Sequence, residues 1–112
     1  MKRIRIGLLA AMAVAAVALV PGVAFGGARA ASSHTVTLHE FRFHPGTLTI
    51  NRGDTVKWVW HDAVEHNVSF HGFHSRTQVH GSYSVRFTHA GTFKYVCTIH
   101  VSEGMRGKII VH

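Results

Sequence analysis

The sequence predicts an all-β fold, an antiparallel Greek-key β-sandwich of about seven strands. Two observations predict it. From Thr35 onward, short runs of alternating apolar and polar residues are separated by turn-forming residues, which is typical of half-buried strands. No stretch after residue 30 shows the repeat of an amphipathic helix. We therefore expect one small β domain over residues 31–112.

The expected strands are short and follow one another at turn-separated intervals. Residues rich in β-branched and aromatic side chains, such as Thr55–Trp60, are typical of them. Turns are indicated by Pro45 and Gly46, by 51–54 and by 89–91. Trp58 is expected in the core, whereas Trp60 lies either near the functional site or over the end of the sandwich. The strands are expected at 35–39, 48–50, 55–60, 67–70, 83–87, 92–97 and 107–111.

Residues 1–30 are expected to be a signal peptide rather than part of the domain. A basic start (Lys2, Arg3 and Arg5) precedes an uncharged apolar run over 6–20, and 28–30 fits a small-x-small cleavage site. Because a membrane span needs about 20 apolar residues, cleavage is favoured over an uncleaved N-terminal anchor, which is the alternative. We expect an extracytoplasmic protein, in the periplasm or at the cell exterior, with membrane attachment only if the leader stays.

The charge indicates which kind of partner the protein binds, and the cysteine content indicates what stabilises so small a domain. The chain has a net charge of +7, but four of its twelve Lys and Arg residues lie in the leader, and the others are scattered among five acidic residues. This argues against nucleic-acid binding and indicates a mild preference for an acidic partner. A single cysteine forms no internal disulfide, so a bound metal is the expected stabiliser of so small a domain.

The candidate metal ligands lie near the end of the chain. Cys97 ends an alternating strand, and His100 and Met105 follow it on one short loop with the spacing Cys-x2-His-x4-Met. A thiolate, an imidazole and a thioether favour copper over magnesium or calcium. His66 is the candidate for a second imidazole, because a short strand pattern follows it. Two histidines and a cysteine with a long axial methionine make the blue-copper arrangement.

These motifs also occur in the order found in a known family. Residues 53–58, 66–68, 91–100 and 105–111 together closely resemble the cupredoxins, small blue copper proteins such as plastocyanin, pseudoazurin and amicyanin. The resemblance covers nearly all of 31–112. It implies a cupredoxin-like domain that holds one type 1 copper through four ligands, namely His66, Cys97, His100 and Met105.

The resemblance further implies roles around the copper. Asn67 would brace the two ligand loops, and its backbone N–H would donate toward the Cys97 sulfur. The Thr98 hydroxyl would be the partner of Asn67. Electrons would leave through the exposed edge of His100, inside an apolar docking patch formed by Ile99, Val101 and Met105. The chain departs from the family at Glu65 and Ile99, where proline is usual, and at Trp60, where asparagine is common.

The leading functional hypothesis is electron transport: a one-electron carrier, not an enzyme, that cycles between Cu(I) and Cu(II). We expect a monomer with weak, transient contacts to larger redox proteins. The alternative is an extracytoplasmic copper-binding, scavenging or sensing protein without electron transfer, which the eleven histidines favour. An oxidase or reductase is disfavoured because no His-x-His pair is present for a second copper centre.

The remaining histidines carry one further hypothesis. His71, His74 and His80 could form a second, surface metal site in the long loop, but solvated loop histidines are the favoured interpretation, because no carboxylate or second cysteine completes a ligand set. The others look dispersed, and no site is predicted from them, since five-residue spacing on strands alternates faces. They are His34, His39, His44, His61, His89 and His112.

Overall fold

The computed structural model describes residues 29–112, and within them the chain forms eight strands and one short 3-10 helix. Residues 1–28 of the expected signal peptide lie outside the described residues. Residues 29–112 contain no helix with the length and apolar character needed to cross a bilayer. The strands are β2 (Ser33–His39), β3 (Arg42–His44), β4 (Thr47–Ile50), β5 (Thr55–Trp60), β6 (Ser69–Phe70), β7 (Ser82–Arg86), β8 (Gly91–Val96) and β9 (Arg106–Val111), with η3 at Val101–Glu103.

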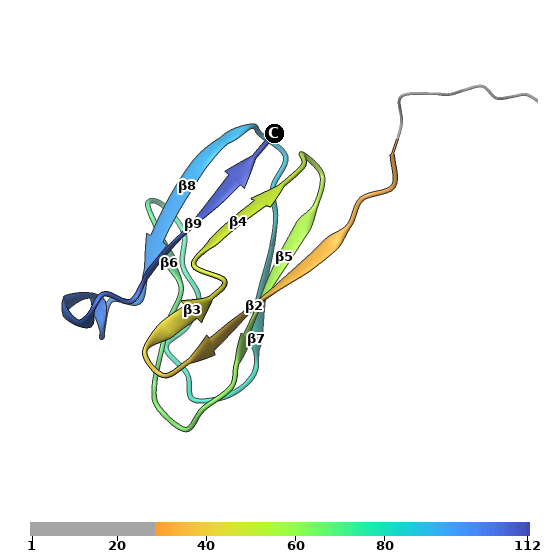
Figure 1. Ribbon diagram of the computed structural model, residues 1–112. Helices are drawn as coiled ribbons and strands as arrows, with labels where there is room; N and C mark the ends of the chain where they lie inside the picture. The colour runs from red at the N-terminus through yellow and green to blue at the C-terminus, as the bar shows by residue number, and fades with distance from the viewer. Residues whose placement is uncertain (1–28) are drawn as a thin grey trace, which may run out of the picture. The chain divides into compact units, whose positions relative to one another are not determined.

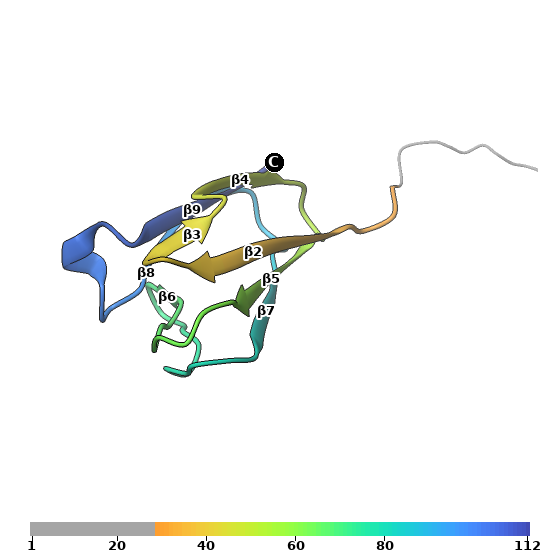
Figure 2. The same cartoon turned by 60° about the horizontal axis from the view of Figure 1, so that its bottom comes forward.

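Two four-stranded sheets face each other, so the all-β sandwich is confirmed (Figures 1 and 2). One has the order β3-β2-β5-β7 and the other β4-β9-β8-β6. The expectation of a purely antiparallel sandwich is wrong, because β2 pairs with β5 and β4 with β9 in parallel. After the β2–β3 hairpin the chain crosses to the other sheet as β4 and then returns, so β5 runs in the same direction as β2.

The core lies between the sheets and is built from the alternating side chains that the sequence pattern indicated. In β5, Val56, Trp58 and Trp60 are buried while Lys57 is exposed. Trp58 is fully buried and contacts several aromatic rings, with Tyr95 of β8 at a centroid distance of 5.4 Å. Such tilted and edge-on contacts add to the stabilisation from burial. The strand that the sequence pattern missed, β3, contributes Phe43 to the same core.

Three connections meet at one end of the sandwich and position the candidate site. They are the β2–β3 turn, the segment between β5 and β6, and the loop between β8 and β9. Figure 1 draws this end of the sandwich at lower left. The turn is unusual because Glu40 and Phe41 both have positive φ, 54° and 59°, without a glycine. The loop is closed at its base by a hydrogen bond from the Cys97 amide to the Met105 carbonyl (3.1 Å).

Candidate metal centre

The sequence-predicted ligands come together at that end of the sandwich. The Cys97 Sγ lies 3.6 Å from His100 Nδ1 and 4.0 Å from His66 Nδ1, and the two Nδ1 atoms are 3.2 Å apart. Cys97 and His66 are fully buried, whereas His100 is partly exposed. Among residues 29–112, no other group of three or more His, Cys, Asp or Glu side chains converges in this way.

These separations suit a single metal ion. Bonds of about 2.0 Å to nitrogen and about 2.3 Å to sulfur place the ligand atoms around a shared ion roughly 3–4 Å from one another. Met105, the proposed fourth ligand, is fully buried. Its backbone carbonyl accepts a hydrogen bond from the Cys97 amide (3.1 Å), and its amide donates to the His100 carbonyl (3.3 Å). A buried thiolate with two imidazoles and a thioether at hand is a donor set that fits copper.

His66 is held in the tautomer that a metal requires. Its Nε2 lies 3.1 Å from the Asp62 carboxylate, which accepts only, so Nε2 carries the proton and Nδ1 keeps its lone pair. Burial lowers the pKa of His66, and the charge of Asp62 offsets only part of this. The imidazole therefore stays neutral, which is the metal-binding form.

Asp62 connects this ligand to the β2–β3 turn, and sequence reasoning missed it. The carboxylate accepts hydrogen bonds from the Glu40 amide (2.9 Å) and the Val64 amide (3.2 Å) as well as from His66. Burial by itself would raise the pKa of Asp62, but these two amides and the nearby His66 outweigh burial, and the pKa is lowered. The only signal in the sequence was its position four residues before His66.

Asn67 and Thr98 are brought together across the two ligand segments. The Asn67 side chain donates to Thr98 Oγ1 (2.8 Å) and Thr77 Oγ1 (2.9 Å) and accepts from the Thr98 amide (2.9 Å). Each residue directly follows a proposed ligand, so these bonds tie His66 to Cys97. Within residues 29–112, the implied hydrogen bond from the Asn67 amide to the Cys97 sulfur is not formed.

The expected docking patch is only partly present. Ile99 is 44% exposed and Val101 is partly exposed beside His100, but Met105 is fully buried. The expectation that Met105 belongs to this patch is therefore wrong, because its side chain points into the core. Phe41, which sequence reasoning missed, is 40% exposed and packs edge-on against His100 with a centroid distance of 4.6 Å.

The loop histidines do not gather into a second metal site, which is the less favoured of the two interpretations. His71, His74 and His80 are all exposed, and they do not form a three-residue group within residues 29–112. His74 instead places Nδ1 2.8 Å from the Ser75 carbonyl.

Comparison with known proteins decides the family. The sequence profile described as copper binding proteins, plastocyanin/azurin family, matches residues 30–112. The chain belongs to this family. Copper is therefore its cofactor, in agreement with the donor set described above.

Individual members of this cupredoxin family resemble the chain at about one third identity. Amicyanin from Paracoccus denitrificans is 36% identical over 84 residues, which cover 68% of this chain and 63% of that protein. Plastocyanin from Scenedesmus fuscus is 35% identical over 83 residues, covering 62% and 85%. A solved Cu(I) form of a mutant amicyanin matches with a TM-score of 0.66 at 33% identity, covering 75% of this chain and 86% of the amicyanin.

Proposed function

We propose that this cupredoxin is an exported one-electron carrier that holds one type 1 copper and exchanges electrons with larger redox proteins. His66, Cys97 and His100 would bind the ion, and Met105 would supply the fourth ligand. The convergence of the Cys97 sulfur and two Nδ1 atoms within 4.0 Å carries the proposal. It is supported by relatives named amicyanin and plastocyanin. The ion supplies the Cu(I)/Cu(II) couple.

The surroundings of the ligands favour electron transfer over loose copper storage. Asn67, Thr98 and Asp62 orient the ligand segments by hydrogen bonds, so little rearrangement accompanies a change of oxidation state. His100 is the ligand closest to solvent, and Phe41 and Ile99 add apolar surface beside it. A partner that docks on this surface would come close to the ion with a small, transient interface.

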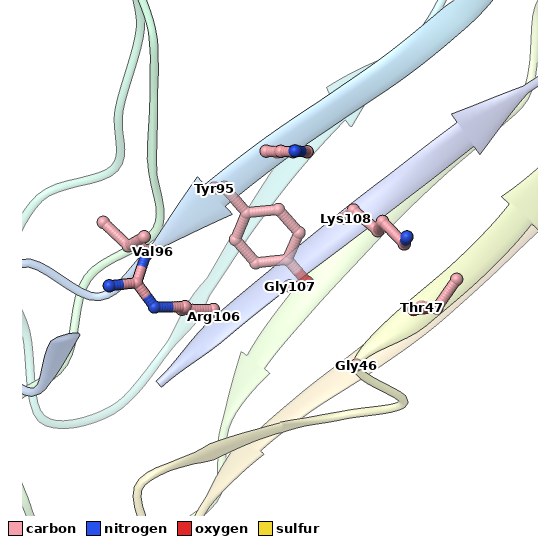
Figure 3. Close-up of a pocket in the computed structure, with 8 residues that line it drawn as sticks. Gly46, Thr47, Tyr95, Val96, Arg106, Gly107 and Lys108 are labelled. Atoms are coloured by element: carbon pink, nitrogen blue, oxygen red, sulfur yellow. The ribbon is translucent and has the colours of Figure 1, made fainter. Parts of the chain in front are cut away.

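Exposed basic residues on β8 and β9 form a strip that favours an acidic redox partner. Lys94 and Lys108 lie directly opposite each other on β8 and β9, and Arg106 follows on the same outer face. They line a shallow groove, where Figure 3 shows Arg106 beside Val96 and Lys108 near Thr47. No ion pair neutralises these three residues within the described part of the chain. Directly opposed like charges destabilise a sheet, whereas an acidic partner would make the strip favourable.

The copper claim is tested by adding one equivalent of Cu(II) to the purified metal-free protein. We expect an intense thiolate-to-copper absorption band and a narrow copper hyperfine splitting in EPR, both absent in Cys97→Ser. Copper binding to the unaltered protein without that band would refute the type 1 assignment.

The carrier claim needs a rate as well. Electron exchange with an acidic redox protein should slow as ionic strength rises, and Lys94→Ser/Lys108→Ser should weaken that dependence. Arg76→Ser, which removes one exposed cation in the loop between β6 and β7, is the control for each single substitution, Lys94→Ser and Lys108→Ser. If the copper-loaded protein fails to exchange electrons with any redox protein tested and binds several copper ions, the result would favour the scavenging alternative.

A further inference from the structure

Three exposed histidines gather on the outer face of the sheet β3-β2-β5-β7, apart from the copper ligands. His39 ends β2, His44 ends β3 and His61 directly follows β5. The ring of His39 lies between the others, with centroid distances of 6.3 Å to His44 and 6.5 Å to His61. His39 is therefore in ring contact with both His44 and His61, although the ring nitrogens of the three do not converge as closely as those of the first centre.

Strand register explains why residues so far apart in the sequence share this face. Thr37 pairs with His44 across the hairpin, so His44 is the diagonal neighbour of His39. The parallel pairing of Leu38 with Trp60 places His61 next to His39, and the His61 amide donates to the Leu38 carbonyl (3.0 Å). Since Leu38 and Trp60 point into the core, the residues that follow them point outward.

One ring nitrogen and one neighbouring carboxylate suit metal binding. His44 Nε2 lies 3.1 Å from the His39 carbonyl, an acceptor, so Nε2 carries the proton and Nδ1 is left with its lone pair. Donation of the second ring N–H to a backbone carbonyl is the usual arrangement of metal-binding histidines. The Glu40 carboxylate lies 3.9 Å from His39 Nδ1 and adds negative charge next to the cluster.

The spacing of the rings is close to what a shared ion requires. Metal–nitrogen bonds of about 2.0–2.1 Å place the centroids of two coordinating imidazoles roughly 5–6 Å apart, depending on the angle at the metal. The observed 6.3 and 6.5 Å exceed this range by roughly 0.3–1.5 Å, so the rings have to move closer to share an ion. The His39 side chain is 46% exposed, and His44 and His61 are also exposed, so the movement that a shared ion requires would involve surface side chains and not the core.

We propose that His39, His44 and His61, with Glu40 beside them, form a second metal site that binds Cu(II). Imidazoles suit divalent first-row ions, and Cu(II) is the most tightly held of these. The site contains no sulfur, so a Cu(II) ion bound here gives no intense thiolate band. It lies beside the first centre, because His61 precedes Asp62, which hydrogen-bonds to His66. This surface site goes beyond electron transfer, since it lets the protein hold a second copper ion.

The test uses the purified protein after one equivalent of Cu(II) has been bound. A second equivalent is titrated while EPR and the thiolate absorption are recorded together. We expect a tetragonal Cu(II) signal with imidazole-nitrogen splitting and no further rise in the thiolate band. In His39→Ala/His44→Ala/His61→Ala, the Kd for the second equivalent should rise at least ten-fold, with the first equivalent unchanged.

The matched control removes the same number of exposed histidines elsewhere, as His71→Ala/His74→Ala/His80→Ala, and should keep the second site. Equal affinity in the two triple variants, or a loss confined to the control, would overturn the proposal. His61→Ala alone, which keeps the backbone hydrogen bond from the residue 61 amide to the Leu38 carbonyl, gives the same comparison if a triple variant fails to fold. Failure of the first equivalent to give a thiolate band would instead count against the proposed function and leave this comparison readable.

Discussion

Replacing Asn67 by alanine should destabilise the protein strongly even without copper. The side chain is 7% exposed and makes three hydrogen bonds, two with Thr98 and one with Thr77. At about 1 kcal/mol for each bond, Asn67→Ala should cost about 2–4 kcal/mol, more if the Thr98 amide is left unpaired. For a domain of this size that loss lowers Tm by roughly 10–20 °C.

The assay is thermal unfolding of the metal-free protein, followed by circular dichroism. Thr77→Val, which removes one of the three bonds, should cost about 1 kcal/mol. Asn67→Ala and Thr98→Val should be less than additive, because they remove the same contact. A Tm for Asn67→Ala no lower than that of Thr77→Val, or full additivity with Thr98→Val, would refute the idea that Asn67 joins the ligand segments.

Three further predictions concern the core and the axial ligand. Gly107→Ala should lower the free energy of unfolding, measured by urea titration, by about 3 kcal/mol, because a Cβ there would lie 2.5 Å from the Tyr95 ring. The control Gly46→Ala, whose Cβ would have no atom closer than 3.8 Å, should be tolerated. Burial raises the pKa of Tyr95 to about 12, so the folded state keeps this proton while the unfolded state loses it near pH 10, and stability falls as pH rises between the two values. From pH 9 to pH 11 the free energy of unfolding should drop by about 1.4 kcal/mol more in the unaltered protein than in Tyr95→Phe, and equal drops would contradict this. Met105→Gln should keep the thiolate band but lower the reduction potential measured by voltammetry, and an unchanged potential would show that Met105 is not coordinated.

Much of the fold was predictable because alternation reports which side of a strand is buried. It does not report strand direction, and the two parallel pairings arise from a crossover that leaves no mark on periodicity. The strand β3 was missed because Arg42–His44 is only three residues long and follows a turn without glycine, asparagine or proline.

That turn also explains what the sequence could not reveal about the sites. Cys97, His100 and Met105 were recognisable because they lie on one loop with a fixed spacing. Phe41, and the gathering of His39 with His44, depend on backbone at Glu40 and Phe41 that folds the chain back on itself. Read as one continuous strand, the five-residue spacing of these two histidines points them to opposite faces, and only the hairpin places them on the same one.

The two tryptophans give the protein a built-in optical probe of its copper centre. The Trp60 indole N–H donates to the carbonyl of His66 itself (3.0 Å), whereas the buried Trp58 indole N–H has no hydrogen-bond partner within the described residues. One fluorophore is thus attached to the peptide group of a proposed ligand, and the other reports the apolar interior. A change at the ligand should alter the emission of Trp60 before that of Trp58, so metal loading and global unfolding are separable in a single fluorescence experiment.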